Sequence, residues 1–362
     1  MFYYLSEFRD VFSWLNIFRY ITFRASMAGV TAFFICLILG PYFIRKLQAL
    51  KFKEIAKRAD CPDLDKFQAS KEGTPTMGGI FIVGSILLSV ALWSDLTNPY
   101  ILVTMIVCLW LAILGFIDDY TKLTKNGKSR GLNKRTKLLW EILIGCLVGA
   151  YLYINPNTST QLDVPFLKNA MIDFGIGYIL FVAVVLIGTC NAVNLTDGLD
   201  GLAIGCVLIV GMTLAILSYI TGNIAMSEYL FIPYIPRVGE LTIFCAAIAG
   251  ASLGFLWFNC YPATIFMGDV GSLALGGTLG TIAVMIKKEL LLIILGGIFV
   301  LEAITVILQV FSFRVFGKRI FKMSPFHHHL QLSGWKESKI ITRLWILAIV
   351  LALITLTTLK IR

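Results

Sequence analysis

Five aspartates stand at the edges of long apolar segments in this chain: Asp118, Asp119, Asp197, Asp200 and Asp269. A carboxylate in such a place is costly unless a partner compensates its charge. Asp118 and Asp119 are adjacent and follow an apolar segment, although the end of a helix favours cations. A divalent cation would remove their repulsion, and magnesium takes one or two carboxylates together with substrate phosphate oxygens. The pair therefore predicts a magnesium site for a phosphorylated substrate.

Glycines accompany the other three aspartates. Asp269 lies in the segment 268–271 (Gly-Asp-Val-Gly), where small residues let the backbone approach a bulky anion. Asp197 and Asp200 lie in the segment 194–201 (Asn-Leu-Thr-Asp-Gly-Leu-Asp-Gly). For these two, helix capping is an equally good interpretation, because aspartate and asparagine favour helix starts and glycine favours helix ends.

Two further segments could contact phosphate. His327, His328 and His329 are the only histidines, and an imidazole can hydrogen-bond phosphate or act as an acid near neutral pH. A solvated cluster is their alternative interpretation. The segment 71–79 (Lys-Glu-Gly-Thr-Pro-Thr-Met-Gly-Gly) begins an apolar stretch, and amides at a helix start suit a phosphate. Its glycines and threonines would equally promote close helix packing.

Glu302 and Gln309 interrupt an apolar segment. They are seven residues apart, so they share one face of a helix. An acid inside a membrane is a functional candidate by default. A buried hydrogen bond from Glu302 to a neighbouring helix is the equally good structural alternative.

The elements that must position these residues are membrane helices. Hydrophobic residues make up 58% of the 362 residues and charged residues 14%, whereas soluble proteins have about 25% charged residues. Apolar runs of roughly 18 residues indicate membrane spans. We predict an all-α, polytopic membrane protein, a single transmembrane domain over 1–362 with an aromatic interfacial segment at 1–24. We place about ten spans, and a count of nine or eleven also fits the pattern. The ten predicted spans are 25–44, 77–94, 100–117, 138–154, 176–194, 202–221, 241–258, 271–286, 290–313 and 341–359.

Most of the 31 lysines and arginines lie in the connections that follow odd-numbered spans. The positive-inside rule therefore places these connections in the cytoplasm and both termini outside. The net charge of +10 favours anionic lipids and substrates, and its dispersal over loops speaks against nucleic-acid binding. Basic and aromatic residues at 313–321 suit a helix on the membrane surface. The predicted cytoplasmic loops lie near 45–76, 118–137, 195–201, 259–270 and 314–340.

At these residues the chain resembles the polyprenyl-phosphate N-acetylhexosamine-1-phosphate transferase superfamily. The Asp-Asp pair marks the superfamily, and the triple histidine together with 73–79 indicates its muramoyl-pentapeptide branch. The resemblance covers nearly the whole chain. The matching segments are 73–79 (GTPTMGG), 118–122 (DDYTK), 194–201 (NLTDGLDG), 266–272 (FMGDVGS) and 327–329 (HHH).

The resemblance implies an enzyme of the bacterial inner membrane. The phosphate of undecaprenyl phosphate would attack the β-phosphate of UDP-MurNAc-pentapeptide, so that UMP leaves and lipid I forms. It implies Mg²⁺ as cofactor, surrounding membrane lipids and a homodimer. Direct attack and a route through an aspartyl-phosphate both need an aspartate, and the ionised lipid phosphate favours direct attack because it is already a competent nucleophile.

The resemblance also implies site residues. Asp269 would be the main magnesium ligand, Asp118 would receive or orient the proton of the lipid phosphate, and Phe266 would stack on uracil. The implied catalytic residues are Asp118, Asp119, Asp269, His327, His328 and His329, with the three aspartates at the metal. The implied substrate-binding residues are Lys71, Thr76, Lys122, Lys125, Asn194, Asp197, Gly198, Leu199, Asp200, Asn259, Phe266, Gly268, Ser272 and Gln309.

Three other functions fit parts of the pattern. A sister transferase that uses UDP-GlcNAc would share the aspartates, although the triple histidine argues against it. A cation transporter could use an intramembrane acid such as Glu302, but most of the candidate acids cluster at one membrane face. A scaffold in cell-wall assembly would not need so many loop carboxylates.

Overall fold

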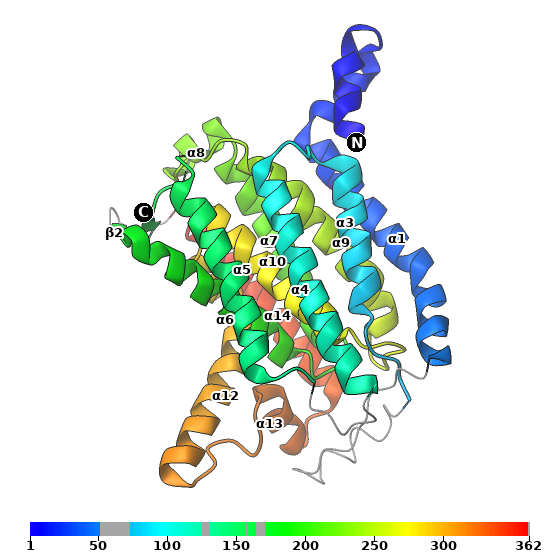
Figure 1. Ribbon diagram of the computed structural model, residues 1–362, viewed down its shortest axis with the longest axis vertical. Coiled ribbons are helices and arrows are strands. Elements are labelled where there is room, and N and C mark those ends of the chain that lie inside the picture. The colour runs from blue at the N-terminus through cyan, green and yellow to red at the C-terminus, as the bar shows by residue number, and fades with distance from the viewer. Residues whose placement is uncertain (51–72, 125–130, 157, 164–170, 361–362) are drawn as a thin grey trace.

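The computed structural model describes all residues except 51–72, 125–130, 157, 164–170 and 361–362. The described residues form a bundle of helices (Figure 1). The long helices are α1 (Ile21–Ala49), α3 (Gly79–Trp93), α4 (Pro99–Thr124), α5 (Lys134–Ile154), α6 (Tyr178–Thr196), α7 (Leu202–Thr221), α9 (Leu241–Asn259), α10 (Gly268–Met285), α12 (Gly297–Phe316) and α14 (Glu337–Thr357). The short ones are η1 (Phe2–Asp10), η2 (Ser13–Arg19), η4 (Gly175–Gly177), α8 (Ile224–Leu230), η5 (Val238–Glu240), α11 (Leu291–Leu295) and α13 (Phe326–Leu332).

A helix stands at each of the ten predicted spans. Within the described part of the chain, nine helices are long and apolar enough to cross a membrane. The tenth, α3, has 15 residues, and at 1.5 Å per residue it is about 22 Å long against a hydrocarbon core of about 30 Å. The chain is therefore a polytopic membrane protein.

Three predicted boundaries are wrong. Helix α4 continues past residue 117 to Thr124, so the Asp-Asp pair lies inside the helix and not at its end. The predicted span 290–313 is broken at Gly296, between α11 and α12. No helix covers all of 313–321, because α12 ends at Phe316 and Gly317 turns the chain with φ 65°.

The structure also contains a small hairpin that the sequence pattern did not predict. Strand β1 (Gln161–Asp163) pairs antiparallel with β2 (Met171–Asp173), with Leu162 opposite Ile172. The hairpin lies between α5 and α6 in the chain, and residues 164–170 at its tip are outside the described part. It leaves the all-helical architecture unchanged.

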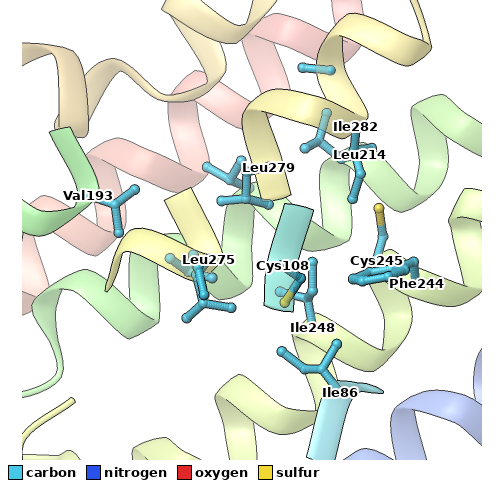
Figure 2. Packing of buried hydrophobic residues seen from close by; sticks show 14 of the residues in the cluster. Ile86, Cys108, Val193, Leu214, Phe244, Cys245, Ile248, Leu275, Leu279 and Ile282 are labelled. Atoms are coloured by element: carbon cyan, nitrogen blue, oxygen red, sulfur yellow. The ribbon is translucent and has the colours of Figure 1, made fainter. Parts of the chain in front are cut away.

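Helix α10 lies at the centre of the bundle (Figure 1) and is buried from Val270 to Met285. Figure 2 labels Leu275 of α10, Cys108 of α4 and Ile248 of α9 in one buried hydrophobic cluster. Because this packing fixes α10 on all sides, it also fixes the first turn of the helix, which begins at Gly268. We call the end of the bundle where α10 begins the site end.

Candidate active site

Three predicted aspartates meet at the site end. Asp118 and Asp119 come from α4, and Asp269 comes from the first turn of α10. The ammonium group of Lys122 lies 2.9 Å from Asp118 Oδ2, 3.5 Å from Asp119 Oδ1 and 3.1 Å from Asp269 Oδ2. Asp119 Oδ2 also accepts the backbone N–H of Val270 at 3.3 Å. Three carboxylates distant in the sequence therefore converge on one cation.

A second cation, Lys137, was not among the predicted site residues. Its Nζ lies 2.8 Å from Asp269 Oδ2 and 3.6 Å from Asp118 Oδ2. The side chain of Lys122 is 40% exposed and that of Lys137 is 18% exposed. The cluster thus holds three carboxylates and only two ammonium groups, both of them partly exposed and Lys122 the more so. The only signal in the sequence was a lysine at the end of the basic connection 118–137.

Two glycines explain why the aspartates can meet. A Cβ on Gly115 would lie 2.3 Å from the backbone oxygen of Asp269, so only glycine lets α4 approach the start of α10 this closely. Gly268 has φ 74°, and a Cβ there would lie 2.6 Å from Asp119 Oδ2 and 3.2 Å from Thr76 Oγ1. Asp269 also lies where the free amides of a helix start favour a carboxylate.

The segment before α3 forms one wall of the cluster. The N–H of Phe266 donates to the oxygen of Pro75 at 2.9 Å, and the N–H of Gly78 donates to the oxygen of Phe266 at 2.8 Å. The N–H of Gly79 donates to the oxygen of Met267, also at 2.8 Å. These bonds hold the predicted phosphate-binding segment against the start of α10.

Two of the implied substrate-binding residues, Asn259 and Asp200, bind the protein's own backbone. Asn259 accepts the N–H of Gly201 at 2.9 Å and donates to the oxygen of Ile265 at 2.8 Å. Asp200 Oδ2 accepts the N–H of Ala263 at 3.0 Å. Both side chains are buried. They join the loop 195–201 to the loop 259–270, so this region is positioned by the residues that were expected to bind substrate.

Other implied residues of this region also have structural contacts. Asp197 is the C-cap of α6, and its backbone N–H donates to the oxygen of Asn194 at 3.3 Å, so it stands at a helix end and not at the helix start that the capping interpretation expected of an aspartate. Leu199 is buried. The buried hydroxyl of Ser272 donates to the oxygen of Gly268 at 3.0 Å.

Gln309 holds the chain where it returns from α12. Its Nε2 donates to the oxygen of Phe321 at 3.0 Å, and its Oε1 accepts the N–H groups of Ile320 and Phe321 at 3.1 and 2.9 Å. All three bonds are made within this return. The predicted Lys71 and Lys125 lie outside the described residues.

The three histidines belong to α13, and His327 and His328 are buried. His328 Nδ1 lies 2.8 Å from Gln331 Oε1, and His329 Nδ1 accepts the N–H of Lys322 at 3.2 Å. The interpretation as a solvated cluster is therefore wrong for two of the three histidines.

Glu302 reaches from α12 to α13. Its Oε2 accepts the N–H of His327 at 3.3 Å and lies 3.1 Å from the Nδ1 atom of the same residue. This contact agrees with the structural alternative for Glu302. On its other side His327 touches Gly198, so the histidines adjoin the loop 195–201.

The donor atoms of the aspartate cluster fit magnesium, which prefers carboxylate and phosphate oxygens. Among the described residues, no three carboxylate, histidine or cysteine side chains are already arranged to hold an ion. Instead, Lys122 and Lys137 hold the oxygen atoms toward which a metal would bind. A metal at the predicted magnesium site therefore requires at least the ammonium group of Lys122, the more exposed of the two, to move aside.

The helical membrane bundle and its cluster of opposite charges fit a transferase that handles an anionic substrate beside the bilayer. A family model described as Glycosyl transferase family 4 matches residues 100–287. The Phospho-N-acetylmuramoyl-pentapeptide-transferase signature 1 matches residues 71–83. The chain is thus a membrane transferase of the glycosyl transferase 4 class.

Full-length relatives define the family more closely. The chain is 50% identical to the Phospho-N-acetylmuramoyl-pentapeptide-transferase of Desulforapulum autotrophicum, over 100% of both chains. It is 50% identical to that of Citrifermentans bemidjiense over 96% of both, and 48% identical to that of Syntrophus aciditrophicus over 100% of both. The chain belongs to the phospho-N-acetylmuramoyl-pentapeptide transferase family, which confirms the predicted branch.

Proposed function

We propose that this protein transfers phospho-MurNAc-pentapeptide from UDP-MurNAc-pentapeptide to undecaprenyl phosphate. An oxygen of the lipid phosphate forms a bond to the β-phosphorus of the donor, the bond from that phosphorus to UMP breaks, and lipid I and UMP result. The observation that supports this most is the convergence of Asp118, Asp119 and Asp269 on shared lysines. The 50% identity to a full-length phospho-N-acetylmuramoyl-pentapeptide-transferase supports it as well.

The proposed site faces the cytoplasm of a bacterial inner membrane, with both termini outside. The distribution of lysine and arginine supports this orientation. It would place the aspartate cluster where a soluble nucleotide-sugar and the head group of a membrane lipid can meet. A cysteine-accessibility assay on intact cells, with a single reporter cysteine at Lys336 or at Phe231, tests the orientation.

Asp269, Asp118 and Asp119 would hold magnesium. Bound there, the ion would neutralise the pyrophosphate and stabilise the charge that develops on the phosphoryl group. Lys122 can turn from the carboxylates toward an incoming lipid phosphate, because its side chain is 40% exposed. Lys137, more deeply buried, would remain beside Asp269 and orient that carboxylate.

The donor would lie across the walls described above. Phe266 and the loop 195–201 would form the uridine side, while Thr76 would meet the pyrophosphate next to Gly268. Asp118 would orient the lipid phosphate or receive its proton. Phosphoryl transfer depends mainly on positioning and on charge neutralisation, so this site does not need an additional nucleophile.

The test is UMP release by the detergent-purified protein with Mg²⁺, undecaprenyl phosphate and UDP-MurNAc-pentapeptide. We expect release only when both substrates are present, and none with UDP-GlcNAc as donor. Release with UDP-GlcNAc alone would assign the sister reaction. Absence of release with either donor, from folded protein, would contradict the proposal.

The route can be tested separately. We propose direct attack, because the ionised lipid phosphate is itself a nucleophile. Incubation with donor labelled in its β-phosphate, without lipid, should leave the protein unlabelled. A phosphorylated aspartate found by mass spectrometry would favour the two-step route.

The proposed assembly is a homodimer in a lipid environment. Light scattering in a mild detergent should give twice the mass of the 40.2 kDa chain after correction for bound detergent. A single-chain mass with full activity would contradict this proposal.

A further inference from the structure

A buried acid and a buried imidazole face each other between α12 and α13. The side chains of Glu302 and His327 are both 0% exposed, and Glu302 Oε2 lies 3.1 Å from His327 Nδ1. The same oxygen accepts the backbone N–H of His327 at 3.3 Å. Glu302 thus holds the start of α13 by a hydrogen bond and lies against the ring that α13 carries, whose two nitrogens have no hydrogen-bond partner among the described residues.

A carboxylate buried inside a membrane helix is costly unless a partner compensates it, so the contact between Glu302 and His327 matters to both residues. Among the described residues, Glu302 Oε1 has no hydrogen-bond partner, and the other carboxylate oxygen, Oε2, contacts only His327. Replacing the acid by an apolar residue would leave the buried N–H of His327 without an acceptor, which carries its own penalty.

The opposite edge of the imidazole lies against Gly198. A Cβ on Gly198 would be 2.3 Å from His327 Nε2 and 2.9 Å from Cε1, closer than real side chains approach. The φ angle of Gly198 is not positive, so the close contact, and not backbone strain, excludes a side chain there. Since Glu302 stands behind the ring, the ring has little room to withdraw.

We infer that Glu302 is a positioning residue that acts through His327 on the nucleotide-binding loop. The chain of contacts runs from Glu302 in α12 through the ring of His327 to Gly198 in the loop 195–201. It sets how far this loop can move away from the donor. The inference rests on the proposed function, since it takes the loop to hold the uridine nucleotide.

The position of the contact chain predicts its kinetic effect. The contacts from Glu302 through His327 reach the loop 195–201, which we propose lies beside the nucleotide. Among the described residues, they do not include Asp118, Asp119 or Asp269. Loss of the contact should therefore weaken donor binding more than it slows the chemical step. Glutamine at position 302 keeps an acceptor for the N–H of His327 but loses the charge.

The first experiment compares Glu302→Leu and Glu302→Gln. Glu302→Leu should raise the KM for UDP-MurNAc-pentapeptide and the Kd for UMP by about tenfold, whereas Glu302→Gln should raise them by about threefold. The kcat should change by less than about threefold in either variant. UMP binding, measured by calorimetry, does not require turnover.

Glu289→Gln is the matched control. Glu289 is a buried carboxylate at the opposite end of the bundle and is paired with Tyr178 and Lys287. This variant should melt earlier while it keeps the wild-type Kd for UMP. If Glu302→Leu melts earlier but binds UMP as wild type does, Glu302 only stabilises the fold and the inference is wrong.

A second experiment tests the contact with Gly198 directly. Gly198→Ala should lower donor kcat/KM by about tenfold, because the new methyl group collides with the ring of His327. In a His327→Ala background the ring is gone, so the added methyl group should cost less than about twofold. Equal losses in both backgrounds would overturn the contact.

The outcomes separate this inference from the proposed function. If the wild-type protein binds UMP and Glu302→Leu weakens that binding, the positioning role stands even if the muramoyl donor is not turned over. If wild type turns the donor over and none of the variants changes KM or Kd, only the positioning role fails.

Discussion

Buried charges occur at both ends of the bundle, and their pairing differs. At the end opposite the site, Arg24 donates to both oxygens of Glu240, at 2.8 and 2.6 Å. Glu289 accepts the hydroxyl of Tyr178 at 2.6 Å and lies 3.1 Å from Lys287. The side chain of Arg24 is 1% exposed. In these two pairs each acid has its own cation, and none of the four charged side chains is more than 11% exposed.

At the site end, Asp118, Asp119 and Asp269 share Lys122 and Lys137. No carboxylate has a cation to itself, and Lys122 is 40% exposed. A buried ion pair in which each group has one partner stabilises the fold, and neither of its groups is available to another ligand. Lysines that several carboxylates share, and that water can reach, can move aside. The carboxylate oxygens are then available to a metal or a substrate. The comparison therefore assigns structure to one end and chemistry to the other.

The largest effect should follow from Asp269→Asn. This change removes the charge on which both lysines converge while it keeps the shape of the side chain. UMP release should fall by about a thousandfold or more, since charge neutralisation dominates phosphoryl transfer. The melting temperature should stay near that of wild type, because one excess negative charge has been removed. A large loss of stability would place Asp269 with the structural pairs and would contradict the comparison.

The reverse result is expected for Arg24→Met. Glu240 would be left buried without its cation, which costs about 3–5 kcal/mol of folding stability. Thermal melting in detergent should show the loss, while kcat per folded molecule stays near wild type. The double variant Arg24→Met, Glu240→Leu should recover part of the stability. A fall in kcat at unchanged melting temperature would show that the two ends are coupled.

Lys137→Met sharpens the comparison within the site. Lys137 lies 2.8 Å from Asp269 and was proposed to orient that carboxylate. Its loss should lower kcat by about 10- to 100-fold, the range for one positioned charge. Steady-state kinetics with saturating donor checks this. Lys134→Met, a change at the start of the same helix, is the matched control and should leave kcat within about twofold of wild type.

The smallest effect concerns Asp95, in the turn between α3 and α4. Burial opposes its ionisation, but hydrogen bonds from Thr97 and the nearby Arg237 outweigh this and lower the pKa of Asp95. A lowered folded-state pKa adds stability above the unfolded value of about 3.9, and this stability is lost as pH falls through the folded-state pKa. Acidification should therefore lower the melting temperature less in Asp95→Asn than in wild type, by a difference worth under about 1 kcal/mol.

Long apolar segments made the fold predictable, because each stands at the position of a helix. The same background made the aspartates conspicuous, and the structure brings Asp118, Asp119 and Asp269 together. The break at Gly296 was not predictable from hydropathy, since the residues on both sides of it are equally apolar.

Residues that act through distant contacts were missed. Arg24 and Glu240 are 216 positions apart, and no local pattern pairs them. Glu141, buried in α5 and bonded to Asn191 at 2.7 Å, was overlooked beside the more conspicuous Glu302. Lys137 was one lysine in a basic loop. In each case helix packing determines the partner, and helix packing cannot be read from a local sequence pattern.

Asp200 and Asn259 show a different limit. A side chain that binds a uridine and one that joins two loops both need hydrogen-bonding atoms next to glycine-rich backbone. The sequence pattern is the same for both, so resemblance implied binding, whereas the structure shows bonds to Ala263, Gly201 and Ile265. The binding role of this region stays a prediction, and the structure adds that both side chains also support the two loops.

Mn²⁺ binding measured by electron paramagnetic resonance tests whether the shared carboxylates form the metal site, with manganese as a stand-in for magnesium at an oxygen-ligand site. Wild type should bind one ion, Asp269→Asn should bind none, and Glu289→Gln should bind the ion as wild type does. Equal binding by wild type and Asp269→Asn, both shown to be folded, would contradict the claim that the shared carboxylates form the metal and substrate site.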